Sequence, residues 1–308
     1  MNGYAYYTVS NWSTNRLGKY TIKIFTIFEF PNKSTKTDTM STDVSRLAQA
    51  LLQHAPFAEA VAALWSGQPI SVEGMTGSSC ALAVAALFPY GSGSMIVVTP
   101  NADTAEQIAD DLMLFLEPEY RLNVLRFPPM TRHDYESETA LAIADGSFGE
   151  RINVLKRLVN RTDQRFVLAV SMEALLHPVL PPVQLKERTQ TLAVNSRVDL
   201  EALRRFLIAG GYHSMTAVDL PGEFAVRGYI LDLFAPDWEQ PVRLEFFNDE
   251  IESIRRFDLT TQRSLEKITE IDITLLQPYE CAGASLLDYF PQSTPIVLVE
   301  PASEGKKT

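Results

Sequence analysis

The sequence has few cysteines and no long apolar run, and each shortage excludes a class of protein. Its two cysteines, Cys80 and Cys281, are far apart and match no CxxC spacing, so we expect neither a disulfide framework nor a redox motif. No apolar run approaches the roughly 20 residues that a membrane helix needs. We therefore expect a protein of a reducing, cytoplasmic compartment.

Histidine is also scarce, which argues against a metal centre. The four histidines stand at positions 54, 133, 177 and 213, and none are spaced i and i+4. His133 and Asp134, near Glu136 and Glu138, are the best metal cluster that the sequence offers, and it is a weak one. Ser78 and Ser79 lack the GxSxG pattern of a nucleophilic serine. We expect no catalytic residue, no bound metal and no cofactor.

The charge distribution disfavours nucleic acid as a partner of this chain alone. The 308 residues carry a net charge of −11, with 46% hydrophobic and 21% charged residues. Residues 1–40 have a net charge of +3, which leaves −14 for the remainder. A body this acidic repels phosphates. The length predicts about two domains, because domains average roughly 100–200 residues.

Residues 1–40 do not resemble the start of a domain. They are rich in Asn, Thr, Tyr and Lys and contain one apolar stretch, Ile22–Phe30. No basic region precedes an apolar one, so a secretory signal is not expected. We predict a poorly ordered extension, with Met40 as the functional start. The alternative is that Ile22–Phe30 adds a strand to the domain that follows.

Residues 41–176 alternate short apolar runs with helical patterns. The expected strands are Ile70–Glu73, Met95–Thr99, Leu122–Phe127 and Phe166–Val170. The expected helices are 41–52 with Val44, Leu47, Leu51 and Leu52 on its apolar side, Ser79–Phe88, Ala102–Leu116 and Glu138–Val159. Strands alternating with helices predict a parallel sheet covered on both faces. We assign this segment to the first part of an α/β domain.

Residues 177–262 are predicted to form an inserted α+β domain. Three prolines in 177–182 break the preceding pattern. A helix is expected at Leu200–Ala209, capped by Asp199 and ended by Gly210 and Gly211. The expected strands are Thr189–Val194, Met215–Leu220, Phe224–Phe234, Val242–Phe247 and Ile251–Phe257, with a tight turn at Asn248 and Asp249. Apolar runs at Ile271–Leu276 and Ile296–Val299 predict that residues 263–308 return to the α/β domain, where the chain is truncated.

The turn from Gly74 to Ala81 has the outline of a phosphate-binding loop without its functional residues. Such a loop needs glycines, a lysine for the phosphates and a Ser or Thr hydroxyl for magnesium. Gly74, Thr76 and Gly77 fit the pattern. The second glycine, the lysine and the hydroxyl are replaced by Ser79, Cys80 and Ala81. We interpret the segment as a degenerate nucleotide loop; an ordinary strand–helix turn is the alternative.

The late apolar strand indicates a second loss in the same site. Nucleotide motors place Asp-Glu after such a strand to hold magnesium and polarise water. The sequence 295–300 reads PIVLVE and keeps Glu300, but Val299 stands where the aspartate belongs. ATP hydrolysis by this chain is therefore not expected.

These motifs, in this order, resemble the UvrB family, and in particular the N-terminal UvrB-like module of transcription-repair coupling factors. The resemblance rests on GMTGSSCALAV, on VVTPNADTAEQIADDLMLFL, and above all on residues 221–266. It covers roughly residues 45–301. It implies a P-loop-NTPase-like parallel-sheet domain with an inserted UvrA-interaction domain, and a non-catalytic adaptor that recruits UvrA in nucleotide excision repair. The alternative is a UvrB-type helicase relative with residual nucleotide or DNA binding.

The resemblance also implies which residues bind UvrA. The family docks through arginines and a carboxylate of the inserted domain, which here correspond to Arg227, Arg243 and Glu245. His213 and Ala225 stand where the family has arginines. His213 can still donate a hydrogen bond, so it is kept among the residues expected to bind UvrA. The alternative is that Arg227, Arg243 and Glu245 pair with one another across neighbouring strands.

Longer family members continue into a polymerase-binding domain and a translocase motor, whose motifs this sequence lacks. RNA polymerase and DNA are thus expected as partners only through regions absent from this chain. The chain is expected to be a fragment or a truncated paralogue.

Overall fold

The computed structural model describes eight stretches of the chain, which form two compact units. The described residues are 19–25, 45–65, 68–90, 93–121, 123–130, 146–160, 165–275 and 283–301. The first unit lies within Met1–Pro129, Arg161–Leu176 and Phe290–Thr308, and the second within Met130–Asn160 and His177–Tyr289. In the part of the chain that the structure describes, no helix is long and apolar enough to span a membrane.

The first unit is built on one mixed sheet with helices. Its strands are β1 (Lys19–Phe25), β2 (Ile70–Thr76), β3 (Met95–Thr99), β4 (Val124–Phe127), β5 (Val167–Ser171) and β14 (Ile296–Pro301). Its helices are α1 (Ser45–Gln53), α2 (Ala55–Trp65), α3 (Ser79–Leu87), α4 (Ala102–Phe115), α5 (Pro118–Arg121) and α9 (Met172–Leu176), with the 3-10 turn η1 (Phe88–Tyr90). The predicted alternation of strand and helix is confirmed.

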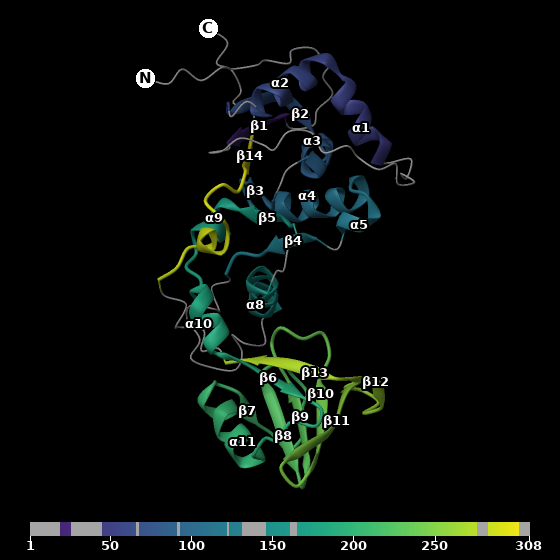
Figure 1. Ribbon diagram of the computed structural model, residues 1–308, viewed down its shortest axis with the longest axis vertical. Coiled ribbons are helices and arrows are strands. Elements are labelled where there is room, and N and C mark those ends of the chain that lie inside the picture. Colours follow the sequence, from purple (N-terminus) through teal and green to yellow (C-terminus); the bar gives the residue numbers. More distant parts are fainter. Residues whose placement is uncertain are drawn as a thin grey trace. The chain divides into compact units, whose positions relative to one another are not determined.

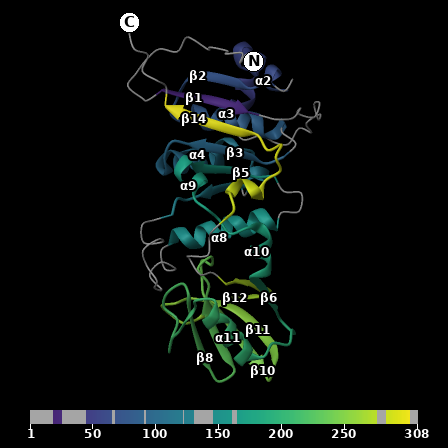
Figure 2. The ribbon, with the colours of Figure 1, turned by 90° about the vertical axis from the view of Figure 1, so that its left-hand side faces the viewer.

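The strand order in this sheet is β2-β1-β14-β3-β5-β4. Figure 2 shows β2, β1, β14, β3 and β5 in this order. The pairs β14–β3, β3–β5 and β4–β5 are parallel, as predicted. β1 is antiparallel to both of its neighbours, β14 and β2. The sheet is therefore mixed rather than purely parallel, because a strand from the N-terminal segment enters it.

β1 corrects part of the prediction for residues 1–40. Lys19–Phe25 is a paired strand and not a poorly ordered extension. The strand begins three residues earlier than the alternative prediction of Ile22–Phe30. Residues 1–18 and 26–44 lie outside the described residues, so the predicted start at Met40 stays a prediction.

The core of the first unit lies between the helices and the sheet. β3 is buried at every position because apolar side chains line both of its faces. α4 begins at a capped end, where the Asn101 side chain accepts the Thr104 N–H at 2.9 Å. In α1 the buried residue is Ala48, while Leu47 is 52% exposed, against the prediction.

The second unit contains one large sheet and one two-stranded sheet. Its strands are β6 (Thr189–Ala193), β7 (His213–Ser214), β8 (Glu223–Arg227), β9 (Ile230–Phe234), β10 (Val242–Phe247), β11 (Glu250–Phe257), β12 (Ser264–Ile268) and β13 (Glu270–Thr274). Its helices are α8 (Gly146–Val159), α10 (Pro182–Glu187) and α11 (Leu200–Ala209), with the 3-10 turn η3 (Leu286–Tyr289) (Figure 1).

The large sheet has the order β12-β11-β10-β9-β8-β7, and β13 pairs with β6. Tight turns join its central strands. Gly228, with φ 61°, turns the chain between β8 and β9, and Asn248, with φ 57°, between β10 and β11. The predicted turn at Asn248 is confirmed. The predicted single strand Phe224–Phe234 is instead a hairpin.

The inserted domain extends beyond its predicted end at residue 262. β12 pairs with β11, and β13 pairs with β6. The described residues 263–275 and 283–289 therefore lie in the second unit, and the described part of the predicted strand Ile271–Leu276 pairs with β6 and not with the first sheet. The predicted strand Met215–Leu220 is irregular chain, and only the neighbouring His213–Ser214 pairs as β7.

Helix α8 also belongs to the second unit. Gly149 passes so close to the loop after β9 that an added Cβ would lie 1.8 Å from the Pro236 carbonyl oxygen. Lys156 Nζ bonds to Asp237 Oδ2 at 2.7 Å and to the Asp272 carbonyl at 3.0 Å. Only part of the predicted helix Glu138–Val159 is described, because residues 138–145 lie outside the described ranges.

The main core of this unit covers one face of the large sheet. Leu203 and Leu207 of α11 pack there with apolar residues of β8 to β11. Asp199 caps α11 as predicted, accepting the N–H groups of Glu201 at 2.9 Å and Ala202 at 3.3 Å.

Candidate functional site

The end of β2, which contains Gly74, and the turn from β2 to α3, which contains Gly77, have a glycine-dependent backbone. Gly74 has φ 78° and Gly77 has φ 52°, both in the left-handed region that favours glycine. α3 begins at Ser79, and its cap residue Ser78 makes no side-chain cap hydrogen bond. Strand, turn and helix follow one another as predicted, with a strand three residues longer.

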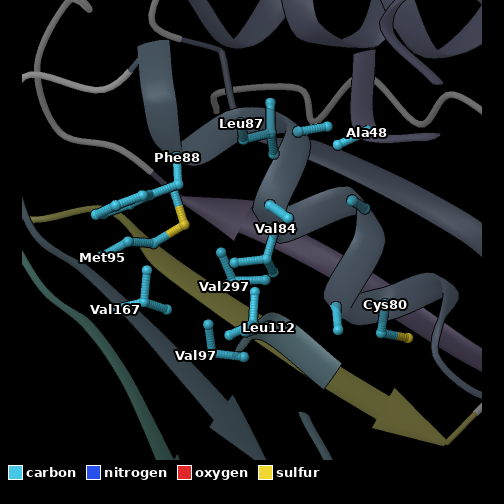
Figure 3. Packing of buried hydrophobic residues seen from close by; sticks show 14 of the residues in the cluster. Ala48, Cys80, Val84, Leu87, Phe88, Met95, Val97, Leu112, Val167 and Val297 are labelled. Atoms are coloured by element: carbon cyan, nitrogen blue, oxygen red, sulfur yellow. The ribbon is translucent and has the colours of Figure 1, made fainter. Parts of the chain in front are cut away.

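Two of the replaced loop residues are part of the hydrophobic core. Cys80 and Ala81 are 1% and 0% exposed. Figure 3 shows Cys80 on α3, with Val84, Leu87 and Val297 among the same buried cluster. Burial raises the pKa of the Cys80 thiol to about 12, so the thiol is neutral at pH 7. Neither residue offers a charge to a ligand in the turn.

The loop and Glu300 reach the same edge of the sheet on separated strands. β2 and β14 both run antiparallel to β1, so their carboxyl ends point the same way. Tyr20 of β1 pairs with Met75 on one side and with Pro301 on the other. At the usual strand spacing, this puts the backbones of Met75 and Pro301 about 10 Å apart. The predicted pair of motifs is thus brought together at one edge, with β1 between them.

The three family-matching residues predicted to bind UvrA and His213, which departs from the family, lie on one face of the large sheet. Side chains alternate between faces along a strand. Phe224, Leu231 and Leu244 fill the core on one face, so their strand neighbours point to the other. In the strand register, Arg227 of β8 and Glu245 of β10 both lie opposite Ile230 of β9. His213 of β7 lies opposite Glu223 of β8. Tertiary structure thus collects His213, Arg227, Arg243 and Glu245 on one face, which we call the open face.

Arg243 is held by a residue that the sequence did not single out. Its Nε and Nη2 bond to the two carboxylate oxygens of Asp232 at 2.6 and 2.8 Å. The Asp232 side chain is only 4% exposed. The Arg243 guanidinium also lies over the Phe257 ring, 4.7 Å from its centroid. Hydrogen bonding to Asp232 raises the pKa of Arg243, which keeps it charged.

Glu245 has its own partners on β11. Its carboxylate accepts a hydrogen bond from Ser253 Oγ at 2.7 Å and forms an ion pair with Arg255. The Ser253 hydrogen bond first, and then Arg255, lower the pKa of Glu245. The alternative prediction, that Arg227, Arg243 and Glu245 pair with one another, is wrong for direct ion pairs, because Arg243 pairs with Asp232 and Glu245 with Arg255. Arg243 and Glu245 interact only as neighbouring charges.

Arg227 and His213 remain accessible at the sheet surface. Arg227 donates from Nε and Nη2 to the Thr216 carbonyl oxygen at 3.2 and 2.8 Å. Both Arg227 and His213 are exposed. Ala225, which stands in place of a family arginine, is 1% exposed. It packs with Val218 and Phe234 in a small cluster on the open face.

Asp232 and Arg255 were missed because their roles depend on pairing between strands. Asp232 lies between two apolar residues of β9, and this polar position in a buried strand was the available signal. The alternation of side chains along β10 places one aromatic in the core and one at the surface. Phe246 is 5% exposed and Phe247 is 69% exposed.

The weak metal candidates gain no support. His133, Asp134, Glu136 and Glu138 lie outside the described residues. Within the described ranges no group of His, Cys, Asp and Glu side chains could hold a metal ion. His177 instead accepts a hydrogen bond at Nδ1 from the Met130 N–H at 3.2 Å.

Comparison with known proteins identifies the second unit. Residues 191–279 match the UvrB interaction domain. A transcription-repair-coupling factor of Myxococcus xanthus is 34% identical over 249 residues, which are 79% of this chain and 20% of that protein. The corresponding factor of Bacillus subtilis (strain 168) is 32% identical over 217 residues, 68% of this chain and 18% of that protein. The corresponding factor of Escherichia coli (strain K12) is 30% identical over 199 residues, which are 65% of this chain and 17% of that protein.

The chain spans about a fifth of the length of these curated relatives. The resemblance inferred from residues 221–266 is confirmed. The matched domain ends at residue 279 and so agrees with the structure, which places β12 and β13 in the second unit.

Proposed function

We propose that this chain, a relative of the transcription-repair-coupling factors that carries a UvrB interaction domain, is a non-catalytic adaptor that recruits UvrA in nucleotide excision repair. The observation that carries the proposal is the open face, where Arg227, Arg243 and Glu245 lie together in this domain. An arginine fixed by a carboxylate presents its remaining N–H groups in one orientation, which suits recognition of a partner carboxylate.

Arg227→Ala is expected to weaken UvrA binding about tenfold, because an exposed arginine at an interface centre is a frequent hot spot. Its only described side-chain bonds, to the Thr216 carbonyl, are on the surface, so the fold should persist. Biolayer interferometry with immobilised UvrA measures the loss. Arg204→Ala, on the exposed side of α11, is the matched control and should bind like wild type.

Arg243→Glu is expected to abolish detectable binding in the same assay. It places a second carboxylate beside the buried Asp232, so thermal unfolding must be measured in parallel. Retention of full UvrA affinity by both Arg227→Ala and Arg243→Glu would remove the proposed interface.

The adaptor proposal includes the absence of nucleotide chemistry. Gly74 in β2 and Gly77 in the turn after it both have positive φ, as the glycines of a nucleotide loop can, which is the feature in favour of a UvrB-type helicase relative. Against it, Cys80 and Ala81 are buried in the core, and Val299 is 3% exposed. The site lacks both the lysine that would contact phosphates and the hydroxyl that would bind magnesium.

Isothermal titration with ATP and magnesium is expected to give no binding at ATP concentrations up to about 1 mM, because no loop cation offsets the triphosphate charge. An ATPase with an intact loop serves as the positive control. Micromolar affinity would favour the helicase-type alternative over the adaptor. RNA polymerase and DNA are proposed as partners of the longer relatives and not of these residues.

A further inference from the structure

A row of basic side chains crosses the open face beyond the residues already discussed. Strand register places Asp232 of β9 opposite Arg243 of β10, Arg243 opposite Arg255 of β11, and Arg255 opposite Lys267 of β12. Residues paired in this way lie on the same face of a sheet. Three cationic side chains therefore lie side by side on neighbouring strands, with the Cβ atoms of paired residues roughly 5 Å apart.

This arrangement is unusual, because like charges placed directly opposite each other destabilise a sheet. Only part of the row is neutralised within the domain. Arg243 is bonded to Asp232, and Arg255 forms an ion pair with Glu245. The Arg255 Nε–H is buried and has no partner among the described residues. Lys267 is exposed, and none of the side-chain hydrogen bonds or ion pairs in the described part of the chain involves it.

The row contrasts with the chain as a whole, whose net charge is −11. Asp232 and Glu245 pair with two of the three cations, so Lys267 and the Arg255 Nε–H, unpartnered among the described residues, are the groups that attract an acidic partner to this face. β12 is an edge strand of the sheet, and its residues Ser264–Lys267 are all exposed, so the end of the row is open to a partner. Charges at the rim of an interface mainly raise the association rate and the salt dependence of binding.

We infer that Arg255 and Lys267 extend the docking face from Arg243 to the β12 edge and receive an acidic segment of UvrA. The inference rests on the proposed function. Arg243 is the positioning end of the row, fixed by Asp232, whereas Lys267 is the accessible end. Arg255 lies between them and holds Glu245 in place, so it serves both the domain and the partner.

Lys267→Glu tests the inference with little risk to the fold, since its side chain has no described partner. It is expected to weaken UvrA binding about tenfold at low ionic strength, mainly through a slower association rate, and to lower the salt dependence of that rate. Lys186→Glu is the matched control, because it makes the same charge change at an exposed position of α10. The control should stay within about twofold of wild type, as expected for charges far from an interface.

The outcomes separate this inference from the proposed function. Absence of wild-type binding to UvrA would overturn both. Wild-type binding that is lost with Arg227→Ala but unchanged in Lys267→Glu would keep the proposed function and overturn the extended face. Binding of a single-stranded DNA oligonucleotide that Lys267→Glu abolishes, with UvrA affinity unchanged, would assign the row to phosphates and overturn it as well.

Discussion

Replacing Lys156 by methionine is expected to destabilise the second unit by about 3 kcal/mol, because it leaves a buried carboxylate without its counter-charge. The side chains of Lys156 and Asp237 are 13% and 5% exposed. Asp237 Oδ1 already has no described hydrogen-bond partner, so Lys156 supplies the principal compensation for this charge. Methionine keeps most of the apolar stem and removes the ammonium.

Urea unfolding combined with hydrogen exchange of the β8–β10 amides measures the effect, since these strands surround the core of that unit. Lys186→Met makes the same change at an exposed position of α10 and should alter stability by less than about 0.5 kcal/mol. Adding Asp237→Leu to Lys156→Met should recover much of the loss, because an apolar pair of similar size replaces the ion pair. Wild-type stability of Lys156→Met would contradict the role given to the pair.

A chain shortened to begin at Met40 is expected to lose about 5 kcal/mol or to accumulate as insoluble protein. It lacks β1, which pairs with β14 on one side and β2 on the other. Each lost backbone hydrogen bond contributes about 1 kcal/mol, and both neighbouring strands become open edges. The expected loss is comparable with the whole stability of a small domain.

Soluble yield and the midpoint of thermal unfolding measure this second effect. A chain that begins at Gly18 retains β1 and is the matched control, expected to behave like the full sequence. Equal solubility and equal midpoints for the two shortened chains would mean that β1 adds nothing to the sheet. They would also favour the prediction that Met40 is the functional start.

Local sequence patterns predicted the existence and the type of most helices and strands. β3 and β10 have the predicted bounds, and the predicted helix at Ala102–Leu116 differs from α4 by one residue. Caps and turns at Asn101, Asp199 and Asn248 are set by side chains close in sequence. Such features are predictable because the interactions that fix them join residues a few positions apart.

The boundaries of the inserted domain could not be predicted as well from local sequence patterns. An apolar strand pattern predicts a strand but does not indicate which sheet that strand joins. Glu270–Thr274 reads as a buried strand equally well in either unit, and only its register with β6 decides the question. The same holds for Gly149 and Lys156 on α8, whose partners lie near residue 237.

The degenerate turn and the docking residues show most clearly what the sequence determines and what the tertiary structure determines. The sequence by itself determined that Cys80 and Ala81 replace a lysine and a hydroxyl, because the chemistry of a side chain follows from its residue type and does not depend on the fold. It also determined that Arg227, Arg243, Glu245 and His213 belong to one inserted domain. These statements depend on residue type and order alone.

Only the tertiary structure decided that β1 lies between β2 and β14, that Arg243 is held by Asp232, and that Arg255 and Lys267 continue its row. Strand order and cross-strand neighbours come from backbone hydrogen bonds between segments that are separated along the chain. A shift of register by one residue would turn every side chain of a strand to the other face. That pairing is a property of the folded sheet, and it places the cations side by side.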